Sequence, residues 1–249
     1  KDLIMKLTVF QPPYPQLGTP ESAQECINWI VEKLQSQQVG KADLIVLPEY
    51  SNSPGLEDPH LMREFSKHEG ALFLENIEKE ATRLKCLIAI GTVSENNSNW
   101  VNRTFVFGPE NGETFLYDKI HLTDMEINIL KLKAGSKVSV FEDKGVRLGF
   151  AVCFDLYFSE YFSAIAAQNT DIIICPSYQR SELGDRICLI SQTRALDSGC
   201  YLIRSSYAIE GSRMGGHSLV ASPEGDLLAN AGTEPGILKI EIDPAKKFI

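Results

Sequence analysis

The sequence lacks several features that would define whole classes of protein. It has no run of about 18 apolar residues, the length that a membrane-spanning helix needs. Residues 1–10 are too polar to be expected as a secretory signal. A basic stripe is missing too, and the net charge is −9, so the phosphate backbone of a nucleic acid is not expected as a partner. We expect neither a nucleic acid nor a membrane among its partners.

Patterns for metals and disulfides are also absent. The four histidines do not have the spacing of zinc ligands. The six cysteines occur singly, without a CxxC pair, at positions Cys26, Cys86, Cys153, Cys175, Cys188 and Cys200. Six cysteines could form a disulfide framework, but that is typical of much shorter secreted chains. We therefore expect free thiols and a cytoplasmic protein.

The composition indicates an ordinary globular protein of α/β class. The chain has 249 residues, of which 43% are hydrophobic, and α/β folds of about this length commonly form one domain. No repeat, low-complexity tract or linker divides it, so residues 1–249 are expected to form a single domain. Two short apolar strands, 43–47 and 171–175, are each stopped by a proline and are expected to be buried on both faces.

Hydrophobic periodicity predicts more strands than helices. Helices are expected from about 20 to 34, 74 to 84, 158 to 165 and 183 to 190, and residues 50–59 are expected to be a loop. A hairpin is expected around Asn111-Gly112, a strong two-residue turn signal. Further strands are expected at 3–10, 87–93, 101–107, 113–117, 138–141, 146–152, 201–205, 218–221, 227–229 and 237–242. This mixture predicts sheets with strands in both directions and helices covering their outer faces.

Three chemically capable residues lie just beyond the ends of predicted strands. Glu49, Lys119 and Cys153 are a carboxylate, an ammonium and a thiol, and loops at the carboxyl ends of strands can converge on one crevice. The carboxylate can take the thiol proton, the thiolate can attack an acyl carbon, and the ammonium can stabilise the oxyanion. Each residue alone has an ordinary interpretation as a surface charge or a buried core thiol. Together they indicate acyl transfer.

The segments around these residues resemble a known family. LIVLPEY (44–50), YDKIHL (117–122) and GFAVCFD (149–155) are similar to the three signature segments of the nitrilase superfamily of carbon–nitrogen hydrolases. Three later segments, TRALDSG (193–199), GGHSLV (215–220) and SPEGDLLA (222–229), follow in the family's order. The resemblance implies a four-layer αββα sandwich of two mixed sheets with helices on the outer faces. It also implies pairing of helices into homodimers or larger homo-oligomers, and no metal or organic cofactor.

The resemblance assigns a catalytic role to each of the three residues. Glu49 becomes the general base, Lys119 the cation that stabilises the oxyanion, and Cys153 the nucleophile, with the backbone N–H of Phe154 as a second oxyanion donor. A nearby lysine and a helix N-terminus are expected to lower the pKa of the Cys153 thiol. Glu160 and Arg194 are expected to form buried ion pairs that hold the cysteine loop.

Two departures from the family pattern concern the substrate site. Many members carry a second glutamate before a turn that is Ala134-Gly135 here, and counting back from this turn gives Asn128, although a shifted alignment gives Glu126. After the cysteine the chain reads DLYFSE, where relatives commonly have an arginine and a proline. The candidate oxyanion or substrate-binding residues are Phe154, Tyr50, Glu126, Asn128, Tyr178 and Arg180.

The segment after the cysteine also bears on the substrate. Phe154-Asp155 replaces the Trp-Glu of nitrilases proper, which favours cleavage of a small amide, including the ω-amide of a carboxylic acid whose carboxylate Arg180 could bind. Hydrolysis of an N-carbamoyl amide or of a nitrile is an alternative within the same family. A binding or scaffold protein that has lost catalysis is a further alternative, motivated by Asn128. A Cys–His mechanism is disfavoured, because His121 and His217 are expected to be structural.

Overall fold

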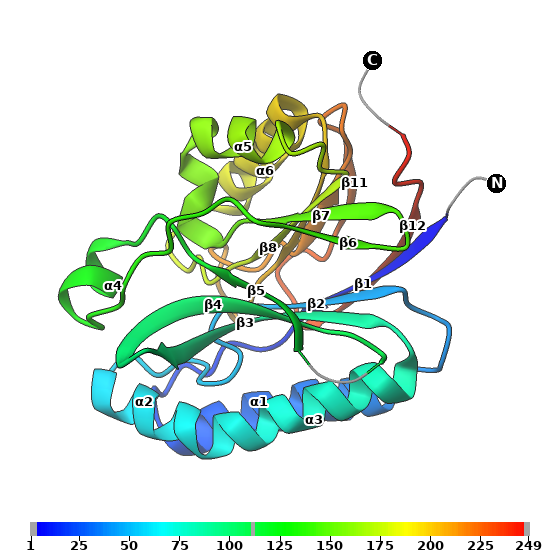
Figure 1. The fold of residues 1–249 in the computed structure, drawn as a ribbon. Coiled ribbons are helices and arrows are strands. Elements are labelled where there is room, and N and C mark those ends of the chain that lie inside the picture. The colour runs from blue at the N-terminus through cyan, green and yellow to red at the C-terminus, as the bar shows by residue number, and fades with distance from the viewer. Residues whose placement is uncertain (1–3, 111–112, 247–249) are drawn as a thin grey trace.

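Two six-stranded sheets stack against each other in this computed structural model, which describes residues 4–110 and 113–246 (Figure 1). In the first sheet three parallel strands, β1–β3, lie between antiparallel neighbours. Its order is β12 (Gly236–Ile242), β1 (Met5–Gln11), β2 (Leu44–Leu47), β3 (Leu87–Asn96), β4 (Asn99–Phe107) and β5 (Glu113–Asp118).

The second sheet repeats this plan. Its three parallel strands are β7–β9, again with antiparallel strands on both sides. The order is β11 (Leu227–Asn230), β10 (Leu219–Ala221), β9 (Tyr201–Ser205), β8 (Ile172–Pro176), β7 (Val146–Phe150) and β6 (Val140–Asp143).

Helices cover the outer faces of both sheets (Figure 1). The first sheet carries α1 (Pro20–Gln35) and α3 (Glu69–Leu84), and the second carries α5 (Ser159–Ala166) and α6 (Gly184–Ser198). The start of α1 follows from its sequence, because Thr19 forms a capping box with Ser22 and Pro20 occupies the first turn. The predicted four-layer αββα sandwich of mixed sheets is therefore confirmed.

The apolar pattern of β2 shows why a strand in this fold must be hydrophobic throughout. Leu44 and Val46 belong to the core between the two sheets, whereas Ile45 and Leu47 belong to the core beneath the helices α1 and α3. All four side chains are 0% exposed. A strand buried on both faces cannot alternate polar and apolar residues.

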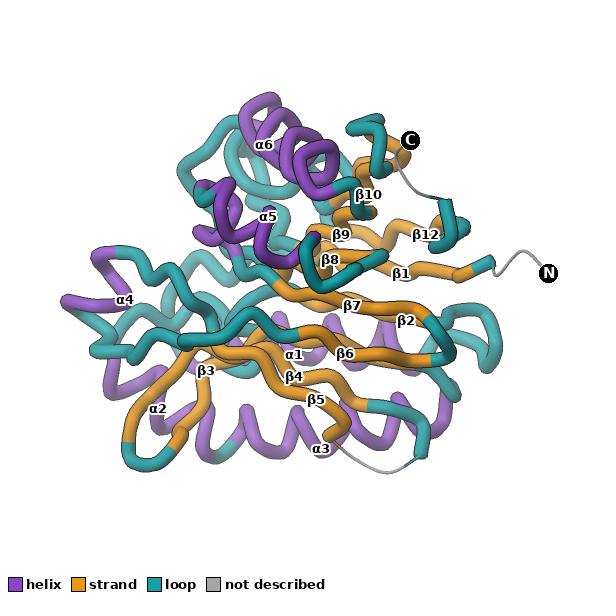
Figure 2. Tube along the Cα trace, turned by 45° about the horizontal axis from the view of Figure 1, so that its top comes forward, coloured by secondary structure: helices purple, strands orange, loops and turns teal. Residues whose placement is uncertain are grey.

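Two short helices were not expected from periodicity. The helix α2 (Pro59–Lys67) begins where a loop was predicted to end, with Asp58 capping its first N–H groups. The helix α4 (Asp124–Asn128) begins with a capping box between Thr123 and Glu126 and projects from the edge opposite the chain termini (Figure 2). The predicted turn at Asn111-Gly112 lies outside the described residues, although β4 and β5 pair as predicted.

Strand direction brings two of the candidate residues to one edge. Because β4 is antiparallel to β3, and β5 is antiparallel to β4, β5 runs parallel to β2 and β3. Glu49 follows β2, and Lys119 follows β5. The carboxyl ends of β2 and β5 therefore lie at the same edge of the first sheet, and so do Glu49 and Lys119. Within the described residues, no helix is both long and apolar enough to cross a membrane.

Candidate active site

Glu49 and Lys119 form a buried ion pair. The Lys119 ammonium donates to Glu49 Oε1 at 2.9 Å, and both side chains are 1% exposed. The backbone of Glu49 is placed by its approach to Gly91, whose N–H donates to the Pro48 carbonyl at 3.1 Å. A Cβ atom at Gly91 would lie 2.5 Å from the Cα of Glu49, so only glycine allows this approach without a shift.

Glu126 is the second carboxylate of the site. Its Oε1 and Oε2 accept from the Lys119 ammonium at 3.0 and 2.9 Å. The capping box orients it, because Oε2 also accepts from the backbone N–H of Thr123 at 2.8 Å. Asn128, in contrast, is exposed at the end of α4. The count that placed Asn128 at the site is wrong, and Glu126 is the residue that faces Lys119.

Asn102 joins these groups and was missed in the sequence. Its Nδ2 lies 2.6 Å from Glu49 Oε1, 2.7 Å from Glu126 Oε1 and 3.0 Å from the Tyr50 hydroxyl. The Tyr50 hydroxyl donates to Glu126 Oε1 at 2.6 Å, so Tyr50 supports the buried carboxylate and is not among the residues lining the pocket. The only available signal for Asn102 was its position on the strand beside β5, where its carbonyl accepts from the N–H of Lys119 at 2.9 Å.

Cys153 lies at a strained turn between β7 and the short 3₁₀ helix η1 (Cys153–Tyr157). Its φ of +47° is rare for a residue other than glycine. Asp155 secures this turn, because its Oδ2 accepts from the N–H of Val152 at 2.8 Å and from the Tyr117 hydroxyl at 3.1 Å. Its Oδ1 accepts from the N–H of His121 at 3.0 Å. Asp155 thus ties the cysteine loop to the segment that carries Lys119.

The remaining predictions about this loop had mixed outcomes. The ring of His121 lies 2.7 Å from Asp155 Oδ1 and stacks on Phe158, which confirms a structural role. The predicted buried ion pairs of Glu160 and Arg194 are wrong. Glu160 is exposed, and Arg194 pairs with Asp197 instead. Arg194 does hold the loop, however, by donating to the carbonyl of Leu156 at 2.7 Å.

The buried charges shift the pKa values of the cluster in different directions. Burial alone lowers the pKa of Lys119, but Glu49 and Glu126 outweigh it and raise that pKa well above its usual value. For Glu126, burial raises the pKa, and Lys119 outweighs burial, so the net shift is downward. For Glu49, burial prevails over Lys119 and the pKa is raised.

The surroundings of Cys153 disfavour the thiolate form of its side chain. Burial raises its pKa well above the usual value, and the nearby Glu49 carboxylate raises it further. Lys119 and a hydrogen bond from the Tyr178 backbone oppose this shift without overcoming it. The expectation of a lowered thiol pKa is therefore wrong, because desolvation and the carboxylate outweigh the ammonium.

One oxygen of Glu49 remains available for proton transfer. Oε1 is occupied by Lys119 and Asn102, whereas Oε2 is buried and has no hydrogen-bond partner among the described residues. A buried acceptor without a partner is costly, and a catalytic role is one explanation for retaining it. The structure thus supplies a neutral thiol and a free carboxylate oxygen with a raised pKa.

A cavity of about 450 Å³ opens at Cys153. Phe154, Tyr178 and Arg180, three of the candidate oxyanion or substrate-binding residues, line it. Arg180 at the rim already forms an ion pair with Glu57. The remaining lining residues are Thr123, Tyr157, Gln179, Ser181 and Glu182.

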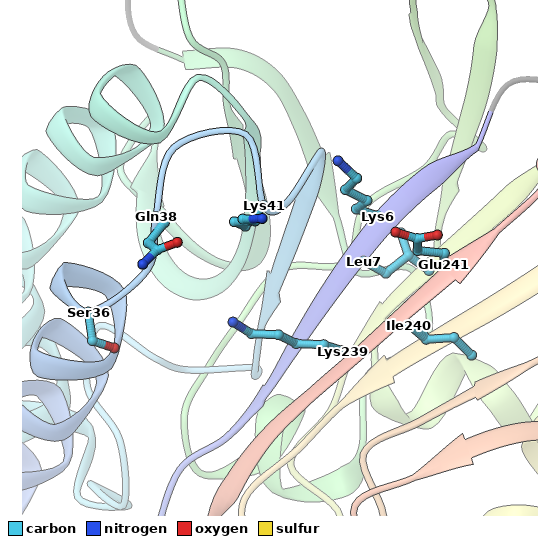
Figure 3. A pocket seen from close by; sticks show the side chains of 8 residues that line it. All are labelled: Lys6, Leu7, Ser36, Gln38, Lys41, Lys239, Ile240 and Glu241. Carbon is cyan, nitrogen blue, oxygen red and sulfur yellow. The ribbon is translucent and has the colours of Figure 1, made fainter.

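A larger cavity of about 740 Å³ lies elsewhere and shares no lining residue with the Cys153 pocket. It is a surface hollow between β1, β12 and the end of α1, with Lys6, Lys41 and Lys239 around it (Figure 3). None of Glu49, Lys119 and Cys153 lines it. Among residues 4–110 and 113–246, no group of three or more His, Cys, Asp or Glu residues is arranged to hold a metal ion.

Comparisons with known proteins identify the family and the fold. The model of the carbon–nitrogen hydrolase family matches residues 6–246. Omega-amidase NIT2 of Homo sapiens is 27% identical over 217 residues, covering 82% of this chain and 78% of its own. Two crystal structures share the fold. Nit3 of Saccharomyces cerevisiae has a TM-score of 0.79 at 24% identity, over 97% of this chain and 90% of its own. An amidase from Nesterenkonia sp. has a TM-score of 0.78 at 19% identity, over 96% and 90%.

The chain belongs to the carbon–nitrogen hydrolase family, as the resemblance of its sequence motifs implied. The prediction of an enzyme that hydrolyses carbon–nitrogen bonds is confirmed.

Proposed function

We propose that the protein is an amidase that cleaves a small, non-peptide amide through a thioester on Cys153. Glu49 acts as the general base, and Lys119 stabilises the oxyanion. The observation that carries this proposal is the free Oε2 of Glu49, the one buried carboxylate oxygen of the cluster without a hydrogen-bond partner among the described residues. The Glu49 charge also acts on the Cys153 thiol, which must lose its proton.

The reaction begins with a proton transfer coupled to attack. Because the pKa of Cys153 is raised, a preformed thiolate is scarce, and Glu49 takes the S–H proton as the sulfur attacks the amide carbon. The tetrahedral oxyanion is stabilised by the Lys119 ammonium and by the N–H of Phe154 in the first turn of η1.

The later steps return the proton. Glu49 passes it to the leaving nitrogen, the C–N bond breaks, and ammonia or an amine departs. Glu49 then activates a water that cleaves the thioester. Glu126 remains ionised throughout, because its pKa is lowered and its carboxylate forms an ion pair with the Lys119 ammonium.

The ω-amide of a carboxylic acid is the substrate class we propose first. Arg180 lines the pocket and could bind a substrate carboxylate in exchange for Glu57. The human relative is named an omega-amidase, which supports the same class. N-carbamoyl amides and nitriles would need the same three residues, so a substrate panel must separate them.

The test is release of ammonia from matched small amides, carbamoyl compounds and nitriles. We expect activity on amides, with Cys153→Ala inactive and Cys175→Ala, which changes another buried thiol, active. Retained activity in Cys153→Ala would refute the mechanism. The alternative of a non-catalytic scaffold had two motives, Asn128 and the altered segment after Cys153. It loses the first, since Glu126 occupies the position for which Asn128 was considered. Rapid and selective alkylation of Cys153 by iodoacetamide would exclude it.

We also propose a homodimer formed across the outer helices of the second sheet. Leu189 and Leu196, seven residues apart on α6, are 67% and 45% exposed on the same side of that helix. We expect sedimentation to give a dimer that Leu189→Asp dissociates, and a monomeric wild type would refute this. Cys26, Cys86, Cys153, Cys175 and Cys188 are free thiols, which supports a reducing compartment such as the cytoplasm.

A further inference from the structure

Two buried side chains in and behind the pocket wall end in N–H groups without partners. Gln179 lines the Cys153 pocket and is 6% exposed, and Arg204 behind it is 0% exposed. Gln179 Nε2 and Arg204 Nη2 are both buried and have no hydrogen-bond partner among the described residues. Buried donors are almost always paired, so two orphans on one pair of side chains point to an acceptor that a ligand supplies.

The contact between these residues fixes the orientation of the Gln179 amide. Arg204 Nε lies 3.0 Å from Gln179 Oε1, and a guanidinium can only donate. The oxygen of Gln179 must therefore face Arg204, which leaves its NH₂ group directed away from the guanidinium. A flipped amide would place donor against donor.

Arg204 is itself held rigidly. It donates from Nη1 to the carbonyls of Gly216 at 2.7 Å and His217 at 3.0 Å. No carboxylate within the described residues forms an ion pair with it. Its positive charge is thus not cancelled by a neighbour, and it polarises the Gln179 amide toward stronger donation.

The free end of Gln179 lies at the pocket wall beside Tyr157. The Tyr157 hydroxyl donates to Glu182 Oε1 at 2.9 Å, and both of these residues line the same pocket. The Gln179 side chain already interacts with the Tyr157 hydroxyl, although without the geometry of a full hydrogen bond. An amide NH₂ carries two donors, so this contact leaves one N–H for a ligand.

We propose that Gln179 determines specificity by donating a hydrogen bond to an oxygen acceptor on the acyl chain of the substrate, and that Arg204 is the positioning residue that fixes the Gln179 amide. The preferred substrates are amides whose acyl chain carries a carbonyl-type oxygen, in preference to purely aliphatic amides. This inference rests on the proposed amidase function and names a selectivity that the Glu49, Lys119 and Cys153 set does not provide.

The test compares pentanamide with its 2-, 3- and 4-oxo derivatives, which differ from it only by one neutral acceptor at three positions. For the best derivative we expect kcat/KM to exceed that of pentanamide by about tenfold, the gain typical of one well-placed hydrogen bond. Gln179→Glu keeps the shape and still accepts from Arg204, but presents an acceptor to the pocket. In this variant the ratio of kcat/KM for the oxo derivative to kcat/KM for pentanamide should fall to about one or below.

Two further variants keep the test decisive. In Arg204→Gln the Gln179 amide can adopt either orientation, so the ratio should fall by about threefold, mainly through KM of the oxo amide. Gln24→Glu, the same substitution on α1 and outside the pocket, leaves both donors in place and should keep the wild-type ratio. A purely structural role of Gln179 would change both substrates equally.

An unchanged ratio in Gln179→Glu, or a wild type that does not distinguish the oxo amides from pentanamide, would overturn the inference. Failure of the wild type to hydrolyse any amide would instead overturn the proposed function. In that case calorimetry with Cys153→Ala measures the same ratio as binding affinity, and equal affinities for pentanamide and all three derivatives would overturn this inference as well.

Discussion

Replacing Glu126 with glutamine should disrupt the buried charge network, because every group that faces its carboxylate is a donor. Oε1 accepts from the Tyr50 hydroxyl, Asn102 Nδ2 and the Lys119 ammonium at 2.6, 2.7 and 3.0 Å. Oε2 accepts from Lys119 at 2.9 Å and from the N–H and hydroxyl of Thr123 at 2.8 and 3.0 Å. In either orientation, the NH₂ of a glutamine would face three of these donors.

The expected loss follows from these contacts. A hydrogen bond to a charged group contributes about 1.5–3 kcal/mol, and breaking a buried ion pair costs about 3–5 kcal/mol. Glu49 still pairs with Lys119, so we expect the free energy of unfolding to fall by about 3 kcal/mol. For a chain of this size that lowers Tm by about 6–12 °C. Because Lys119 loses a carboxylate that raises its pKa and fixes its position, kcat/KM should fall by about 100-fold.

Thermal unfolding and amide hydrolysis measure both effects. The matched control is Asn128→Ala, because Asn128 lies two residues further along α4 and is exposed. It should leave Tm and kcat/KM near the wild-type values. The reasoning is refuted if Glu126→Gln unfolds and reacts like the wild type, or if Asn128→Ala causes the same loss.

Three further predictions concern the residues that place or activate the nucleophile. Gly91→Ala should reduce stability by about 1–3 kcal/mol and impair hydrolysis, because its Cβ would meet Glu49 Cα at 2.5 Å; unfolding in urea checks this, and an unchanged midpoint would contradict it. A raised pKa favours the protonated form of Glu49, so kcat/KM should fall with decreasing pH through a value above the 4.5 of an ordinary glutamate, and a pH profile with no such limb would argue against Glu49 as base. Asp155→Asn should weaken the hydrogen bonds from the Val152 N–H and the Tyr117 hydroxyl and slow acylation by about 10-fold or more. Single-turnover kinetics measure the acylation rate, and a wild-type rate would show that Asp155 does not position Cys153.

The features that local sequence determines were predicted well. The run from Leu44 to Leu47 is apolar without alternation, and Pro48 stops it, so both the buried strand and the location of Glu49 at its end follow from the sequence. The same reasoning located Cys153 after β7. These predictions succeeded because strand burial and proline termination depend on neighbouring residues.

Most features that were not predicted depend on distant contacts, and the position of Glu126 is the exception. Choosing between Glu126 and Asn128 required the capping box of Thr123, a local signal that was available but overlooked. Asn102 could not be identified, because its three partners come from distant segments that only the fold brings together. The pKa of Cys153 was predicted in the wrong direction, because the sequence does not show how deeply a residue at the end of a strand is buried.

The most direct measurement is mass spectrometry of the enzyme quenched during turnover of an amide. The account predicts one acyl group, attached to the peptide that contains Cys153, and its disappearance in both Cys153→Ala and Glu49→Gln. Ammonia release without such an adduct, or with the acyl group on another of the six cysteines, would contradict it.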